Sequence, residues 1–93
     1  MNTDPCPIEV TLYTRPGCHL CEDAKLAIAP LLLEFRAVLR EVNIDQDPLL
    51  ATRYGLDIPV VFIGPRKAAK HRVDVHQFRR QLQEAVAQGE RFL

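Results

Sequence analysis

The chain has 93 residues, 47% of them hydrophobic, and its 12 Lys and Arg are balanced by 12 Asp and Glu. This length fits one domain, residues 1–93, large enough to bury a core of its own. The balanced charge argues against a broad basic surface for nucleic acid or an anionic membrane, and no apolar run approaches the ~18 residues of a membrane span. The polar, proline-interrupted start of the chain has no export signal, so we expect a cytoplasmic protein.

The first third of the chain predicts a strand followed by a helix. Residues 8–13 alternate apolar and polar side chains and are rich in β-branched residues, as strands are. Over residues 20–35, apolar residues recur three and four positions apart, which predicts a helix with one face toward the core. Pro30 falls within this pattern. Because proline lacks a backbone N–H, it predicts either a kink at this point or a helix end at Ala29.

The middle of the chain predicts a second strand and a short helix. Residues 37–44 are mostly apolar, and the two charged residues at their centre indicate a strand at the edge of a sheet. Asp47 precedes a proline, a pair that is typical of a helix start, and Gly55 is typical of a helix end. We therefore expect a helix over residues 49–54.

The last third predicts a hairpin and a final helix. Residues 60–63 form a continuous apolar run bounded by prolines, which is typical of a central strand covered on both faces. A weaker strand is expected over residues 68–73, close enough to pair with the first as a hairpin. Asp74 then caps a helix that is expected to end at Gly89. The order β-α-β-α-β-β-α predicts an α/β fold whose first two strands are parallel.

Two cysteines, Cys18 and Cys21, stand where the first predicted strand meets the first predicted helix. A thiolate on Cys18 would accept hydrogen bonds from free N–H groups at the helix start, which lower a thiol pKa from ~8.5 toward ~3.5–7.5. Arg15 and His19 are expected to lower this pKa further. Cys21 lies one turn later on the same helix face, so we expect Cys18 to attack a disulfide and Cys21 to resolve the intermediate.

A second motif, Ile58-Pro59-Val60, opens the third predicted strand. Together with the Cys-x-x-Cys pair in this element order, it resembles the thioredoxin superfamily and, within it, the small glutaredoxin-like proteins. The resemblance implies a thioredoxin-like, three-layer α/β/α fold with a mixed four-stranded sheet in the order 2-1-3-4. It also implies that Pro59 is cis and packs beside the active-site sulfurs. Ile58 and Val60 would then flank the substrate through main-chain N–H and C=O groups.

The same resemblance implies a thiol–disulfide oxidoreductase that acts on protein or small-molecule disulfides. Glutathione or a flavoprotein reductase would restore the dithiol, and no metal or other bound cofactor is expected. Asp74 corresponds to an acidic residue that grips the ammonium of a γ-glutamyl group in that family, although helix capping explains it equally well. The paired glycines that precede this residue in members that bind glutathione well are absent. We expect a monomer.

Other interpretations of the cysteines stay open. One is a non-enzymatic zinc-binding or partner-docking module on the same fold, in which His71 and His76 would join the cysteine pair as ligands. The 49 residues between Cys21 and His71 are far more than the ~12–15 of a zinc finger. Another is a family member that uses Cys18 alone, and a third is an inert pair. Cys6 stands apart from the pair and is expected to be an unpaired thiol without a function.

Overall fold

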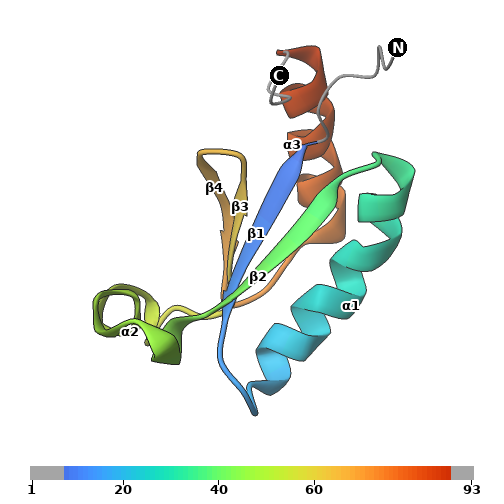
Figure 1. Cartoon of the computed structure of the whole chain (residues 1–93). Helices are drawn as coiled ribbons and strands as arrows, with labels where there is room; N and C mark the ends of the chain where they lie inside the picture. The colour runs from blue at the N-terminus through green and yellow to red at the C-terminus, as the bar shows by residue number, and fades with distance from the viewer. Residues whose placement is uncertain (1–7, 89–93) are drawn as a thin grey trace, which may run out of the picture.

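The computed structural model describes residues 8–88, which form a mixed four-stranded sheet and three α-helices (Figure 1). The strands are β1 (Glu9–Thr14), β2 (Val38–Asn43), β3 (Val60–Ile63) and β4 (Arg66–Lys70). The helices are α1 (His19–Glu34), α2 (Pro48–Tyr54) and α3 (Val75–Ala87), and a short 3-10 turn, η1 (Ile44–Gln46), precedes α2. The sheet order is β2-β1-β3-β4, with β1 parallel to β2 and the other pairs antiparallel. The predicted topology is confirmed.

The alternation of side chains along β1 divides the sheet into two faces. Val10 and Leu12 are buried on the face that α1 and α3 cover, and there they belong to the main core. The buried members of this core are Ile8, Val10, Leu12, Ile28, Leu31, Leu32, Val61, Ile63, Phe78, Leu82 and Ala85. Tyr13 points to the other face, where it packs with Tyr54 of α2. Figure 1 shows α2 at one end of the sheet, so most of this second face carries no helix.

Helix α1 continues past Pro30 to Glu34, so the expectation that it might end at Ala29 is wrong. An interior proline costs about 3 kcal/mol because it removes one helical hydrogen bond and crowds the preceding turn. The two residues that follow it, Leu31 and Leu32, are both buried in the main core. Burial of one leucine contributes about 1.5–3 kcal/mol, so packing of the last turn offsets the proline.

Strand β4 covers Arg66–Lys70, whereas residues 68–73 were predicted, so the expected strand begins too late. The hairpin turn occupies only residues 64 and 65, and Gly64 has a φ of +56° that suits a tight turn. Pairing between β3 and β4 therefore resumes directly after the turn, at Arg66 and Lys67, whose charges are more typical of a loop than of a strand. The strand ends before His71, which has a φ of +66° and whose N–H still donates to the Pro59 carbonyl.

Two aspartates cap the later helices, as predicted. The Asp47 carboxylate accepts a hydrogen bond from the Leu49 N–H at 2.9 Å, and the Asp74 carboxylate accepts one from the Gln77 N–H at 3.1 Å. Each satisfies a backbone donor that the first helical turn leaves without a partner. The predicted helix end at Gly89 and the unpaired Cys6 lie outside the described residues. Within residues 8–88, none of the helices is both long and apolar enough to span a bilayer.

Candidate redox site

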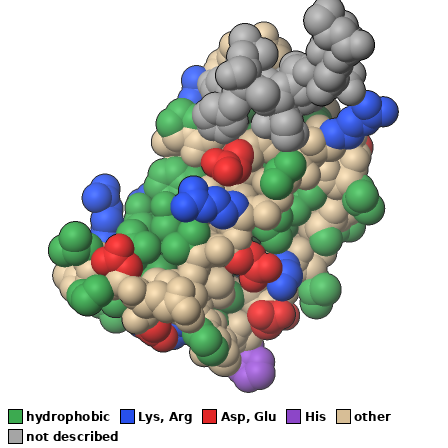
Figure 2. Space-filling view, in the orientation of Figure 1, with side chains coloured by type: hydrophobic (Ala, Val, Ile, Leu, Met, Phe, Trp, Pro, Cys, Tyr) green, Lys and Arg blue, Asp and Glu red, His purple; other side chains and the backbone are tan. Residues whose placement is uncertain are grey.

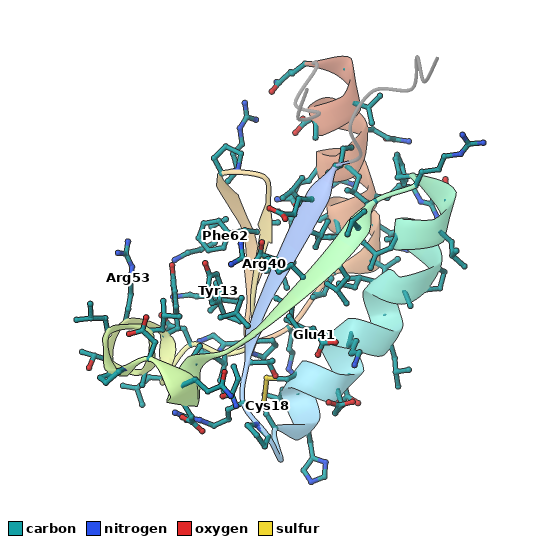
Figure 3. All side chains as sticks on the ribbon, in the orientation of Figure 1. Tyr13, Cys18, Arg40, Glu41, Arg53 and Phe62 are labelled. Atoms are coloured by element: carbon teal, nitrogen blue, oxygen red, sulfur yellow. A yellow bond between two sulfur atoms is a disulfide. The ribbon has the colours of Figure 1, made fainter. Side chains whose placement is uncertain are left out.

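Cys18 and Cys21 form a disulfide at the start of α1, with their Cα atoms 5.2 Å apart. Figure 3 shows this bond below the end of β1. Cys21 is almost fully buried, with 1% of its surface exposed, while Cys18 is partly exposed. A reagent in solution therefore reaches the sulfur of Cys18 more easily than that of Cys21, which is the asymmetry expected of an attacking and a resolving thiol.

The turn before α1 places the Cys18 sulfur against the helix end. Gly17 has a φ of +80°, a conformation that glycine adopts at little cost, and it leads the chain from β1 into the helix. Cys18 is the N-cap residue with an extended backbone, and its sulfur accepts a hydrogen bond from the Cys21 N–H at 3.2 Å. In the reduced protein, a thiolate at this position would meet the same donor and the positive end of the helix dipole.

Arg15 lies close to the cysteine pair in sequence, but its side chain contacts Asp45. The guanidinium donates from its second terminal nitrogen to Asp45 Oδ1 at 2.8 Å, and from Nε to Oδ1 at 3.0 Å and to Oδ2 at 3.3 Å, so that two nitrogens and both carboxylate oxygens take part. The Arg15 carbonyl accepts a hydrogen bond from the Cys18 N–H at 3.4 Å, so Arg15 touches the site through its backbone. His19 is exposed. The predicted influence of Arg15 and His19 on the thiol stays a prediction.

The Ile58–Pro59 peptide bond is cis, and Pro59 is buried. The backbone around it is already partly paired: the Ile58 N–H donates to the Tyr54 carbonyl at 3.1 Å, and the Pro59 carbonyl accepts from the His71 N–H at 2.8 Å. Val60 is buried within β3. Among the described residues, no hydrogen bond uses the Ile58 carbonyl. The Ile58 carbonyl is therefore a main-chain acceptor beside Pro59 that the fold leaves available to a substrate.

Asp74 lies at the start of α3, where its carboxylate caps the helix. The hydrogen bond from the Gln77 N–H holds the pKa of the Asp74 carboxyl below its ordinary value of 3.8, with smaller contributions from His76 and Arg80. The side chain is exposed and carries a negative charge at neutral pH. The structure thus confirms Asp74 as a cap, and its contact with a ligand ammonium stays a prediction.

The histidines proposed as zinc ligands do not gather around the cysteines. The His71 imidazole faces Asp57, with Nε2 3.9 Å from Oδ1, and His76 is exposed on the first turn of α3. Within residues 8–88, no three His, Cys, Asp or Glu side chains come together as a metal site. No specific arrangement in the described chain therefore favours the zinc-binding alternative.

A cavity of about 200 Å³ lies beside the site, between the first half of α1 and the connection from β4 to α3. Leu20, from between the two cysteines, lines it together with Asp23, and His71 and Arg72 line it from the other side. The cavity thus joins apolar surface to one acidic and two basic side chains next to the disulfide. Sequence reasoning missed it because its two walls lie about 50 residues apart in the chain.

The contact between Arg15 and Asp45 was also missed, although one signal could have found it. Parallel strands bring their carboxyl ends to the same edge of a sheet, and the register pairs Thr14 with Asn43. Arg15 and Asp45 follow these paired residues by one and two positions, so an opposite charge at each place predicts an ion pair.

Comparison with known proteins agrees with this geometry. A family model described as a glutaredoxin-like domain (DUF836) matches residues 9–83. A glutaredoxin-like protein YDR286C homolog from Dictyostelium discoideum is 34% identical over 73 residues, which cover 72% of this chain and 68% of the relative. These matches, together with a cysteine pair at disulfide distance, support a redox-type function and, at a coarse level, an oxidoreductase.

Solved structures show the same fold. Protein XcR50 from X. campestris is 35% identical, with a TM-score of 0.69 over 82% of this chain and 97% of that chain. Protein Ne2328 from Nitrosomonas europaea is 28% identical, with a TM-score of 0.67 over 84% of this chain and 94% of that chain. A glutaredoxin from Brucella melitensis, at 24% identity, a TM-score of 0.55 and a coverage of 96% and 88%, shares the fold. The chain therefore belongs to the glutaredoxin-like (DUF836) family, within the thioredoxin superfamily.

Proposed function

We propose that this protein is a thiol–disulfide oxidoreductase in which Cys18 is the attacking thiol and Cys21 the resolving thiol. The observation that supports this most is the unequal exposure of two bonded cysteines at a helix start, with Cys18 accessible and Cys21 buried. An inert structural disulfide has no need of an accessible sulfur on a helix N-terminus, whereas an exchange reaction does.

In the proposed reaction, the Cys18 thiolate attacks one sulfur of a substrate disulfide and releases the other sulfur as a thiolate. The Cys21 thiol then loses its proton and attacks the Cys18 sulfur, which releases the second substrate sulfur and closes the Cys18–Cys21 disulfide. Two electrons and two protons pass from the protein dithiol to the substrate. The Ile58 carbonyl accepts no other backbone hydrogen bond, so it would accept one from an N–H of an extended substrate chain that lies beside Pro59.

The oxidised pair must then be reduced again. Two glutathione molecules would supply the electrons through a mixed disulfide at Cys18, or a flavoprotein reductase would transfer them directly. The Asp74 carboxylate at the start of α3 would attract the ammonium of a glutathione γ-glutamyl group. Protein and small-molecule disulfides are both within the proposed substrate range, because Cys18 is partly exposed to solvent.

The roles of the two cysteines can be separated by substitution. Cys18→Ser should abolish reduction of a standard protein disulfide such as that of insulin. Cys21→Ser should abolish it too, yet retain reaction with a glutathione mixed disulfide, which needs one thiol alone. Cys6→Ser is the matched control and should leave both activities unchanged. If Cys18→Ser reduced either substrate as fast as the unaltered protein, the proposal would be wrong.

A further inference from the structure

Helix α1 carries apolar residues on its solvent face as well as on its core face. Leu26 and Leu33 are 73% and 83% exposed, and Ala29 and Pro30, also exposed, lie between them. Seven residues are two helical turns, so the two leucines lie on one line about 10.5 Å apart. We call these four residues the α1 stripe. Figure 2 shows hydrophobic side chains standing out from the surface over α1.

The α1 stripe differs from the outer face of α3, which is polar. Opposite its buried residues, α3 presents Arg80, Gln83 and Glu84, all exposed. A surface helix normally has such a polar outer face. Single exposed leucines are common, but leucines aligned on one helix face with only small or apolar residues between them indicate a contact surface.

The ends of the α1 stripe carry opposite charges. Glu22 is exposed one turn before Leu26, and Arg36 is exposed just after the helix ends. Neither forms a salt bridge with another described residue, whereas Lys25 and Glu34 on the flanks of the helix pair with Glu41 and Arg79. The Glu41 carboxylate holds the Lys25 ammonium and raises the pKa of Lys25, and the neighbouring Glu22 adds a smaller contribution. The stripe therefore ends in one acidic and one basic residue that take part in no salt bridge within residues 8–88.

We propose that two copies of this chain associate through the α1 stripe, with the two α1 helices antiparallel about a two-fold axis between Ala29 and Pro30. In this arrangement each Leu26 packs against Leu33 of the second copy. The small side chain of Ala29 and the compact ring of Pro30 allow the helices to approach closely at the axis, within the usual 8–10 Å. An interface of this kind is self-complementary, because each residue contacts its symmetry-related counterpart.

The charges of Glu22 and Arg36 favour antiparallel over parallel helices, and a second copy of the chain over a lipid surface. With the helices antiparallel, Glu22 of each copy lies next to Arg36 of the other, whereas parallel helices would bring like charges together. An anionic lipid surface would instead be repelled by Glu22 and by the exposed Asp23 beside it. One helix face is a small interface, below the ~1,200 Å² of stable complexes, so the association is weak and depends on protein concentration.

Sedimentation equilibrium of the full chain tests this directly. The mean mass should rise from 10.6 kDa toward about twice that value between about 1 µM and 1 mM protein. Leu26→Gln with Leu33→Gln should raise the dissociation constant about tenfold or more, because both leucine contacts are lost. The matched control is Leu49→Gln with Leu56→Gln, two leucines that are 80% and 94% exposed away from α1, and it should leave the dissociation constant unchanged.

Exchanging the charges of Glu22 and Arg36 tests whether the partner is a second copy of the chain. Glu22→Lys alone and Arg36→Asp alone should each weaken association, and the two substitutions together should restore it, because the pair is then reversed. Asp suits the left-handed backbone of Arg36, whose φ is +54°. A chain that stays monomeric throughout the concentration range would overturn the proposal. Association that survives the two leucine substitutions would also overturn it. So would a Glu22→Lys, Arg36→Asp double variant that associates as weakly as the two single variants. None of these measurements depends on redox activity.

Discussion

The guanidinium of Arg15 and the carboxylate of Asp45 form a bidentate ion pair between the loop before the cysteines and η1. The pair joins two segments at the same edge of the sheet, 30 residues apart in the chain. The Arg15 and Asp45 side chains are 36% and 49% exposed, so the pair contributes at most about 1 kcal/mol to stability. Asp45 also neutralises the cation nearest in sequence to Cys18, so we expect the ion pair to weaken the predicted effect of Arg15 on the Cys18 thiol.

Asp45→Asn should therefore lower the pKa of the Cys18 thiol in the reduced protein. The change removes a negative charge and releases the Arg15 guanidinium, and both effects favour the thiolate, by less than about one unit at this exposed site. The measurement is the pH dependence of alkylation by iodoacetamide in a Cys6→Ser, Cys21→Ser background. Adding Arg15→Gln should cancel most of the shift. A Cys18 pKa that stayed the same or rose in Asp45→Asn would contradict the assigned role of the ion pair.

Asp74 predicts a pH-dependent contribution to stability. Its folded-state pKa lies below the ordinary 3.8 because of the Gln77 N–H, so the cap stabilises the protein above that ordinary value and is lost as pH falls through the folded pKa. Asp74→Ala should lower the melting temperature at pH 7 by a few degrees, and the difference should shrink below pH 3.8. Asp74→Asn, which keeps an acceptor oxygen, is the control. A deficit in Asp74→Ala that did not shrink with acid would argue against the cap.

We expect replacement of Pro30 by alanine to stabilise the protein. Pro30→Ala restores a backbone N–H toward the Leu26 carbonyl and removes the crowding of the proline ring, at an exposed position that the core does not use. Urea unfolding at low protein concentration should show a gain of about 1–3 kcal/mol at an unchanged m-value. Ala29→Gly on the neighbouring exposed position should instead cost about 0.5–1 kcal/mol. If Pro30→Ala and the unaltered chain were equally stable, the expected cost of the proline in α1 would be contradicted.

Much of this fold was predictable because local signals and hydrophobic patterns agreed. The capping aspartates Asp47 and Asp74, the apolar run of β3 and the periodicity of α1 each pointed to the element that the structure contains. The two errors had a common cause. At Pro30 and at Arg66, local composition argued against regular structure, but burial of Leu31 and Leu32 and immediate hairpin pairing decided the outcome.

Some features of the candidate site were also predictable from the sequence, and others were not. The cysteine pair and Pro59 were predictable because spacing and a resemblance identify them, and the structure adds their disulfide, their unequal exposure and a cis bond. The partner of Arg15 and the hydrogen bond from the His71 N–H to Pro59 depend on strand register and on one left-handed residue. The first could have been inferred from opposite charges that follow two paired parallel strands, whereas the second has no local sequence pattern and becomes visible when the chain is folded.

The central claim is that the helix start holds Cys18 as a reactive thiolate, and the pKa of that thiol tests it most directly. In the reduced Cys6→Ser, Cys21→Ser variant, absorbance of the thiolate at 240 nm can be followed against pH for Cys18 alone. We expect a pKa between about 3.5 and 7.5, well below the ~8.5 of an ordinary cysteine. A value at or above about 8.5 would show that α1 does not activate this sulfur, and it would leave the proposed exchange reaction without its nucleophile.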